Sequence, residues 1–164
     1  MATPTYTLID STVLGSSASS VTFSGISATG KGDLVLVAEV TGSGGLAAGL
    51  MRVNSDSGAN YRWVTAIGTG STTVSSSTSS TTGIGSGLNA DTTEKAIAIF
   101  QLMDYSATDK HKSVLVRGNN VDRGTYMYAN RWANTSAITS IEVLTTTNQF
   151  AAGSSFYLYQ IVSE

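Results

Sequence analysis

The chain has 164 residues, of which 47 are Ser or Thr and 12% are charged, and its net charge is −2. The nine Lys and Arg are scattered, which argues against nucleic-acid binding because that function needs clustered cations. No apolar run reaches the roughly 18 residues that span a bilayer, and no secretion signal is visible in MATPTYTLID. Without Cys, disulfides and thiolate metal sites are excluded. The length predicts a single domain over 1–164.

Short apolar segments follow one another along the chain, and most alternate with period two or are rich in β-branched residues. Clusters of Gly, Ser, Asn and Asp separate them. Ten segments are expected to be strands: 6–9, 20–26, 33–40, 49–53, 61–67, 95–103, 113–118, 125–132, 138–144 and 155–162. This pattern predicts an all-β, antiparallel β-sandwich of about ten strands, of jelly-roll type.

One of these segments, DLVLVAEV over 33–40, is apolar at nearly every position, with Glu39 as the exception. A strand of this kind is expected in the middle of a sheet. By contrast, the Ser/Thr/Gly-rich stretch over 68–91 has only Val74, Ile84 and Leu88 as apolar anchors. It is expected to form a long surface loop. If its hydroxyls bond to a neighbouring subunit, the loop and the N-terminus would both be ordered by an assembly.

The stretch RVNSDSGANYRW raises the possibility of a calcium site. Asn54, Asp56 and Gly58 occupy positions 1, 3 and 5 of an EF-hand-like loop. However, Ala59 stands where the loop needs Gly, and Thr65 stands where it needs a bidentate acid. Short polar residues between two strands are what a tight turn requires. The segment is therefore predicted to be a turn, with no metal site.

A catalytic function has little support in the sequence. His111 is the single histidine, and it lies in a polar segment, DYSATDKHKS, where a solvated loop side chain is expected. No GxSxG elbow, paired-acid pattern or phosphate-binding loop is present. We therefore expect no enzyme, no catalytic residue and no cofactor.

Four aromatic residues could form a stacking platform for sugar rings: Trp63, Tyr126, Tyr128 and Trp132. The last three share one face of a strand by alternation. The other interpretation is that these rings fill the space between two sheets, and the sequence favours it. We keep the glycan-binding interpretation as the alternative.

Both ends of the chain resemble a known group of proteins. YTLIDSTVLGSSASSVTFSGI followed by GDLVLVAEV, then LMRVNSDSGANY, and finally RWANTSAITSIEVLTTTNQFAAGSSFYLYQI look like small virion proteins of tailed bacteriophages, cyanophages included. The closing FAAGSSFYLYQI is the most specific part, although Gln160 stands where relatives commonly have Gly. The resemblance weakens between residues 68 and 125.

The resemblance implies a non-enzymatic β-sandwich on the exterior of a virus particle, often as an oligomer. A capsid decoration, cement or head-fibre subunit is the first expectation. The alternatives are a tail-fibre or receptor-binding domain that recognises host glycans, and a non-viral carbohydrate-binding module. Expected partners are copies of the chain and other virion proteins, with no nucleic acid and no membrane, and assembly would take place in the host cytoplasm.

Overall fold

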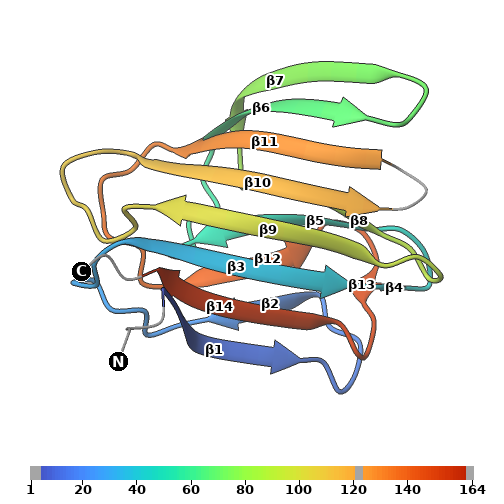
Figure 1. Ribbon diagram of the computed structural model, residues 1–164, viewed down its shortest axis with the longest axis horizontal. Helices are drawn as coiled ribbons and strands as arrows, with labels where there is room; N and C mark the ends of the chain where they lie inside the picture. Colours follow the sequence, from blue (N-terminus) through green and yellow to red (C-terminus); the bar gives the residue numbers. More distant parts are fainter. Residues whose placement is uncertain (1–4, 121–123, 162–164) are drawn as a thin grey trace.

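The computed structural model describes residues 5–120 and 124–161 and shows an all-β protein (Figure 1). These residues form fourteen strands and no helix, and their strand pairs are all antiparallel. The antiparallel sandwich predicted from the sequence is thereby confirmed. In the part of the chain that is described, no helix could cross a membrane.

Each of the ten segments expected to be strands overlaps one. In chain order the strands are β1 (Tyr6–Val13), β2 (Ser20–Phe23), β3 (Asp33–Val40), β4 (Gly42–Ser43), β5 (Ala47–Val53), β6 (Tyr61–Gly68), β7 (Thr73–Thr81), β8 (Ile84–Ala90), β9 (Ala96–Met103), β10 (Lys112–Asn120), β11 (Gly124–Trp132), β12 (Ile141–Thr145), β13 (Gln149–Phe150) and β14 (Ser155–Ile161).

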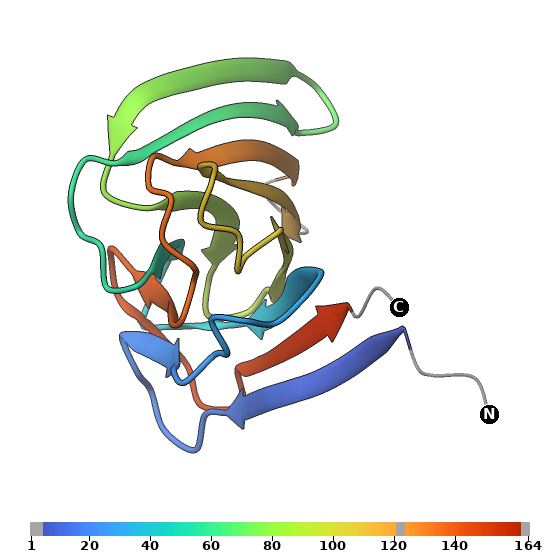
Figure 2. The same cartoon turned by 90° about the vertical axis from the view of Figure 1, so that its left-hand side faces the viewer.

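Two sheets form the layers of the sandwich (Figure 2). The large sheet has the order β1-β14-β3-β9-β10-β11-β6-β7, and the small sheet has the order β2-β12-β5-β8. Strands β4 and β13 form a separate short pair. As its apolar sequence predicts, β3 lies inside the large sheet, between β14 and β9. We call the side of the large sheet that packs on the small sheet its inner face, and the other side its outer face.

Apart from the hairpins β6–β7 and β10–β11, the two layers have four strands each. In chain order, β1, β3, β9 and β14 lie in the large sheet, while β2, β5, β8 and β12 form the small sheet. The chain changes layer between successive members of this set at every step except from β5 to β8. Two further hairpins, β6–β7 and β10–β11, extend the large sheet beyond β9. Crossing between layers is a feature of jelly rolls, but the jelly-roll assignment itself stays a prediction.

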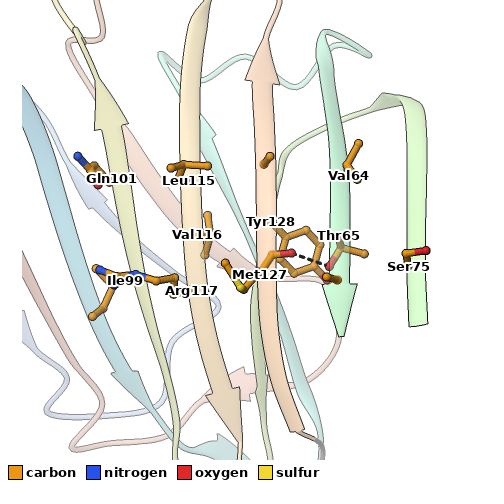
Figure 3. A pocket seen from close by; sticks show the side chains of 12 residues that line it. Val64, Thr65, Ser75, Ile99, Gln101, Leu115, Val116, Arg117, Met127 and Tyr128 are labelled. Carbon is orange, nitrogen blue, oxygen red and sulfur yellow. Dashed lines mark hydrogen bonds between the residues drawn. The ribbon is translucent and has the colours of Figure 1, made fainter. Parts of the chain in front are cut away.

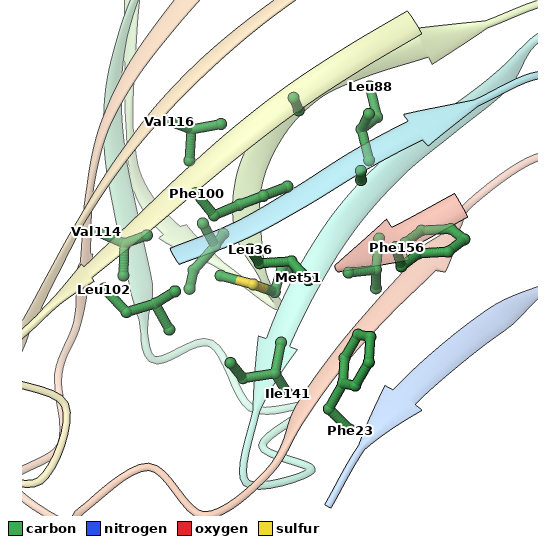
Figure 4. Packing of buried hydrophobic residues seen from close by; sticks show 14 of the residues in the cluster. Phe23, Leu36, Met51, Leu88, Phe100, Leu102, Val114, Val116, Ile141 and Phe156 are labelled. Atoms are coloured by element: carbon green, nitrogen blue, oxygen red, sulfur yellow. The ribbon is translucent and has the colours of Figure 1, made fainter. Parts of the chain in front are cut away.

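The core lies between the inner face and the small sheet (Figure 4). Leu36, Phe100 and Val116 point into it from the large sheet, and Met51 and Ile141 from the small sheet. Each of these side chains is at most 1% exposed. Burial of such a side chain stabilises the fold by about 1.5–3 kcal/mol. This burial holds the two layers together, since the chain has no disulfide.

The expectation of one long loop over 68–91 is wrong for most of that stretch, because it contains β7 and β8. β7 is held by a backbone ladder to β6, which needs no apolar side chain. In β8, Ile84 and Leu88 are buried beneath the large sheet. Neither strand has the apolar alternation on which the sequence prediction relied. The N-terminus, also expected to contact neighbours, lies in residues 1–4, outside the described residues.

Candidate binding surface

The four aromatic residues proposed for sugar stacking lie on the inner face of the large sheet. Trp63 belongs to β6, and Tyr126, Tyr128 and Trp132 belong to β11. Trp132 is 1% exposed and Tyr126 is 7% exposed, so neither ring offers a face to solvent. Trp63 and Tyr128 are half-buried and pack edge to face, with ring centroids 5.4 Å apart. The rings therefore contribute to packing, as the core interpretation expects, and the four do not form an open platform.

Two glycines in β8 allow this strand to approach the aromatic rings. A Cβ on Gly85 would lie 2.6 Å from Cδ1 of Tyr128, and one on Gly87 would lie 2.8 Å from Cβ of Tyr126. The side chain of Asn130 then joins the two layers. Its Oδ1 accepts a hydrogen bond from the backbone N–H of Gly85 at 2.8 Å, and its Nδ2 donates to the Gly85 carbonyl at 3.4 Å. The Gly-Ser-Gly sequence of β8 thus serves packing.

The turn between β5 and β6 is organised around the carboxylate of Asp56. This group accepts hydrogen bonds from the indole Nε1 of Trp132 at 2.7 Å, from the backbone N–H of Gly58 at 2.8 Å and from Nδ2 of Asn60 at 2.9 Å. Partial burial acts to raise the pKa of Asp56, but these hydrogen bonds to the ionised form outweigh it and lower the pKa. The buried Trp132 ring therefore has a charged hydrogen-bond partner in the turn.

The prediction that NSDSGA forms a turn is confirmed. Asn54 and Ser55 have φ values of 51° and 56°, in the left-handed region that short polar residues tolerate. The Asn54 side chain fastens the turn to the segment before β12. Its Oδ1 accepts from the backbone N–H of Thr139, and its Nδ2 donates to the carbonyl of Ala137, both at 2.8 Å. Among the described residues, no group of three or more His, Cys, Asp or Glu could hold a metal ion.

Two neighbouring basic residues have opposite environments. His111 is exposed in the loop before β10, as the sequence predicts. Lys112 is 1% exposed, and its ammonium donates to the carbonyls of Ala107 at 2.5 Å and Thr135 at 3.2 Å. Burial lowers the pKa of Lys112. The lysine therefore joins two loops at one end of the sandwich, a structural role that its polar sequence surroundings did not indicate.

The outer face of the large sheet carries two rows of residues that cross all eight strands, each residue pairing with the next across the ladder. We call them the apolar rows, because eleven of the sixteen residues are apolar and Arg117 alone is charged. The first row is Leu8, Tyr159, Val35, Gln101, Leu115, Ala129, Val64 and Ser77, and the second is Ser11, Tyr157, Val37, Ile99, Arg117, Met127, Ala66 and Ser75.

The part of the apolar rows on β6, β10 and β11 is open to solvent. Met127 and Val64 are each 58% exposed, and Leu115 is 45% exposed. Around these side chains the outer face forms a pocket of about 500 Å³, which extends to Ile99 and Gln101 of β9 (Figure 3). Contiguous exposed apolar surface on a soluble protein marks an interaction site. The open part of the apolar rows is therefore the candidate binding surface of this chain.

Two arginines stand next to the apolar rows. Arg62 of β6 and Arg131 of β11 are directly opposite each other in the ladder, and both are exposed. Within the described residues neither takes part in an ion pair. Like charges in directly opposed positions destabilise a sheet, so a carboxylate from outside the chain would relieve their repulsion. This pair favours a partner that has acidic groups beside an apolar patch.

Sequence reasoning did not identify the apolar rows, although a signal was present. The segments KAIAIFQLM and SVLVRG have apolar residues at successive positions, so both faces of each strand are apolar. Such a pattern is also typical of a strand that is buried on both faces within one chain, so it does not by itself indicate an exposed surface. Which of the two faces the small sheet covers depends on the order of strands in the sheets. The local sequence of one strand does not determine that order.

Comparison with known proteins identifies no family. No protein-family model matches the chain, and no curated protein matches it. Among solved structures, exo-inulinase from Aspergillus awamori aligns with 95% of this chain at 11% identity and a TM-score of 0.41. The chain spans 29% of the length of that structure. A similarity of this size carries no argument about function.

Proposed function

We propose that this chain is a non-enzymatic structural subunit of a bacteriophage virion, and specifically a capsid decoration, cement or head-fibre subunit. The observation that carries the proposal is the pair of apolar rows. Removing apolar surface from water is favourable by about 25 cal/mol per Å², so these rows gain free energy when a neighbouring protein covers them. A protein built in this way adheres to a surface.

The resemblance at the two ends of the chain supports the viral part of the proposal. The matching segments contribute β1, β2 and β3 at the start, and β12, β13 and β14 at the end. The partners that fit are virion proteins, including copies of this chain. The opposed Arg62 and Arg131 add a chemical requirement, because they favour a partner surface with carboxylates.

Glycan binding by a tail-fibre domain, or by a non-viral carbohydrate-binding module, stays the alternative proposal. Sugar recognition combines an exposed aromatic face with several polar groups, whereas the open part of the apolar rows is mainly aliphatic, as at Val64, Leu115 and Met127. Among the four aromatic candidates, Trp63 and Tyr128 keep partial exposure. Binding on a glycan array that is lost in Trp63→Ala, in a variant that still folds, would support the alternative.

The experiment that tests the proposal is incorporation into virus particles. Particles purified by density gradient from cultures that express the chain are analysed by quantitative peptide mass spectrometry. We expect the chain in a stoichiometric ratio to the capsid or tail protein. Leu115→Asp, which places a charge in the apolar rows, is expected to reduce incorporation strongly.

The matched control is Ser24→Asp, because Ser24 is exposed in the loop after β2, away from the outer face. This variant should be incorporated like the parent. Both purified variants should keep the circular dichroism spectrum of the parent. Absence of the parent chain from particles would contradict the proposal, as would normal incorporation of Leu115→Asp.

A further inference from the structure

Five neighbouring strands of the large sheet carry positive charge and no carboxylate. β9, β10, β11, β6 and β7 lie side by side, and none of them contains Asp or Glu. Their outer face has three exposed arginines: Arg117 of β10, Arg131 of β11 and Arg62 of β6. The ion pairs among the described residues include none of the three. In a chain of net charge −2, this part of the outer face is complementary to an acidic partner.

The arginines lie at the two ends of an apolar strip. Arg117 pairs with Met127 across the ladder, and Arg131 lies four residues beyond Met127 on β11. The rise along a strand and the distance between strands therefore place the Cα atoms of Arg117 and Arg131 about 14 Å apart. Leu115 and Ala129 form the pair between them on this face. In the direction of the strands, the outer face thus presents a cation, an apolar patch and a second cation.

Two adjoining hollows connect these positions. Arg117 lines the pocket of about 500 Å³ (Figure 3). A second hollow, of about 420 Å³, is lined by Arg62 and Arg131. Val64 and Ala129 line both hollows, so the two are continuous. We call the combined hollow the arginine groove.

We propose that the arginine groove binds an extended segment of another virion protein, in which a carboxylate, an apolar side chain and a second carboxylate occupy every second position. Alternate side chains of an extended chain point to the same side at a spacing of about 6.7 Å. Outer-face residues along β10 and β11 have the same spacing, so the three side chains match Arg117, Leu115 and Arg131. The guanidinium groups bind the carboxylates through charge-assisted hydrogen bonds.

An acidic polysaccharide would satisfy the charges but not the apolar strip. The aromatic residues that line the two hollows, Trp63 and Tyr128, are half-buried and belong to the inner face. Leu115 and Val64 are aliphatic, and an apolar side chain of a peptide would remove them from water. The identification of the partner as a virion protein rests on the proposed function. Recognition of the acidic–apolar–acidic pattern does not depend on it.

A synthetic peptide tests this pattern directly. The probe is Ac-Ser-Glu-Ser-Leu-Ser-Glu-Ser-amide, titrated to about 5 mM into the ¹⁵N-labelled chain and followed by NMR. Binding should shift the amide signals of Leu115 and Ala129 and leave that of Met51, in the core, unchanged. A peptide with Ser in place of Leu, or with Lys in place of both Glu, should bind about threefold more weakly or worse. Polygalacturonate, counted per sugar, should bind no more tightly than the peptide without Leu.

Variants of the chain test the arginines one at a time. Arg117→Gln and Arg131→Gln should each weaken binding of the probe about threefold or more. Lys31→Gln is the matched control, because Lys31 is exposed in the loop before β3, and it should bind like the parent. Arg117→Glu should lose the probe and bind a peptide in which one Glu is replaced by Lys. A diffuse positive field would not give this exchange of preference. Circular dichroism confirms that each variant is folded.

Several results would overturn the inference: no shift at the highest peptide concentration, equal binding of the Glu and Lys peptides, or unchanged binding by Arg131→Gln. Tighter binding of polygalacturonate than of the probe would also overturn it, as would dimerisation of the free chain that Arg131→Gln abolishes, because a second copy would then occupy the groove. A chain that enters virus particles but does not bind the probe would leave the proposed function intact. A chain that binds the probe but is absent from particles would do the reverse.

Discussion

The inner and outer faces of the large sheet are built from alternate residues of the same strands, yet the chain covers only one of them. In β10, Val114 and Val116 are at most 1% exposed, whereas Leu115 between them is 45% exposed. All three side chains are aliphatic, so composition does not distinguish the faces. The position of the small sheet distinguishes the two faces. Apolar residues on the covered face form the core, while those on the uncovered face are the ones for which we propose a contact outside the chain.

The sharpest test of this comparison makes the same substitution on each face. Leu102 of β9 is 0% exposed, and Leu115 of the adjacent β10 lies on the outer face. Leu102→Ala should lower the free energy of unfolding by about 2–5 kcal/mol, through lost burial and a residual cavity. Leu115→Ala should change it by no more than about 0.5 kcal/mol. Urea titrations of the isolated chain measure both, and equal losses would contradict the assignment of the two faces.

A smaller change in the free energy of unfolding is expected from a substitution in the β5–β6 turn, where Asp56 binds the Trp132 indole. Asp56→Ala leaves the buried Trp132 indole N–H without its partner and should lower the free energy of unfolding by about 1–3 kcal/mol. The pKa of Asp56 is below its ordinary value of 3.8 when the chain is folded. Its contribution is therefore complete above pH 3.8 and disappears as the pH falls through the folded pKa.

Urea midpoints measured from neutral pH down to acid check both parts of this prediction. The parent should lose stability in acid more steeply than Asp56→Ala. Asp109→Ala, at an exposed carboxyl, is the control and should follow the parent. Identical acid dependence in the parent and Asp56→Ala would show that the carboxylate does not hold the turn.

The smallest change in stability is expected where β8 packs closely against the inner face of the large sheet. A Cβ at position 85 would lie within 2.7 Å of two carbon atoms of the Tyr128 ring, which is half-buried and can shift outward. Gly85→Ala should therefore destabilise the fold by about 1 kcal/mol, at the low end for overpacking. Gly68→Ala is the control, because nothing lies within 4 Å of its added Cβ. Near-ultraviolet circular dichroism of Trp63 and Tyr128 should change only in the first variant.

The fold could be predicted from the sequence wherever alternation or turn chemistry was explicit. Each of the ten expected segments overlaps a strand, and Asn54 and Ser55 take the left-handed conformation that a tight turn requires. β7 and β8 were missed for different reasons. β7 is held by backbone hydrogen bonds, which leave no apolar pattern, and β8 uses glycines to make room for aromatic rings.

The candidate surface was harder to predict, because it depends on which strands become neighbours. The apolar rows join β1 at one edge to β7 at the other, through residues far apart in the sequence. Likewise, alternation placed Tyr126, Tyr128 and Trp132 on one face, but it could not say that β8 would cover that face. Pairwise order between strands is a property of the whole chain, and one local pattern does not determine it.

The apolar rows contain a methionine that can report directly on whether they are covered. Met127 is 58% exposed on the outer face, and Met51 is 0% exposed in the core. Hydrogen peroxide oxidises an accessible thioether to the sulfoxide, which peptide mass spectrometry quantifies for the free chain and for purified particles. Met127 should oxidise quickly in the free chain and slowly in particles, with Met51 slow in both. Equal oxidation of Met127 in the two states would contradict the claim that the outer face adheres to a neighbouring protein.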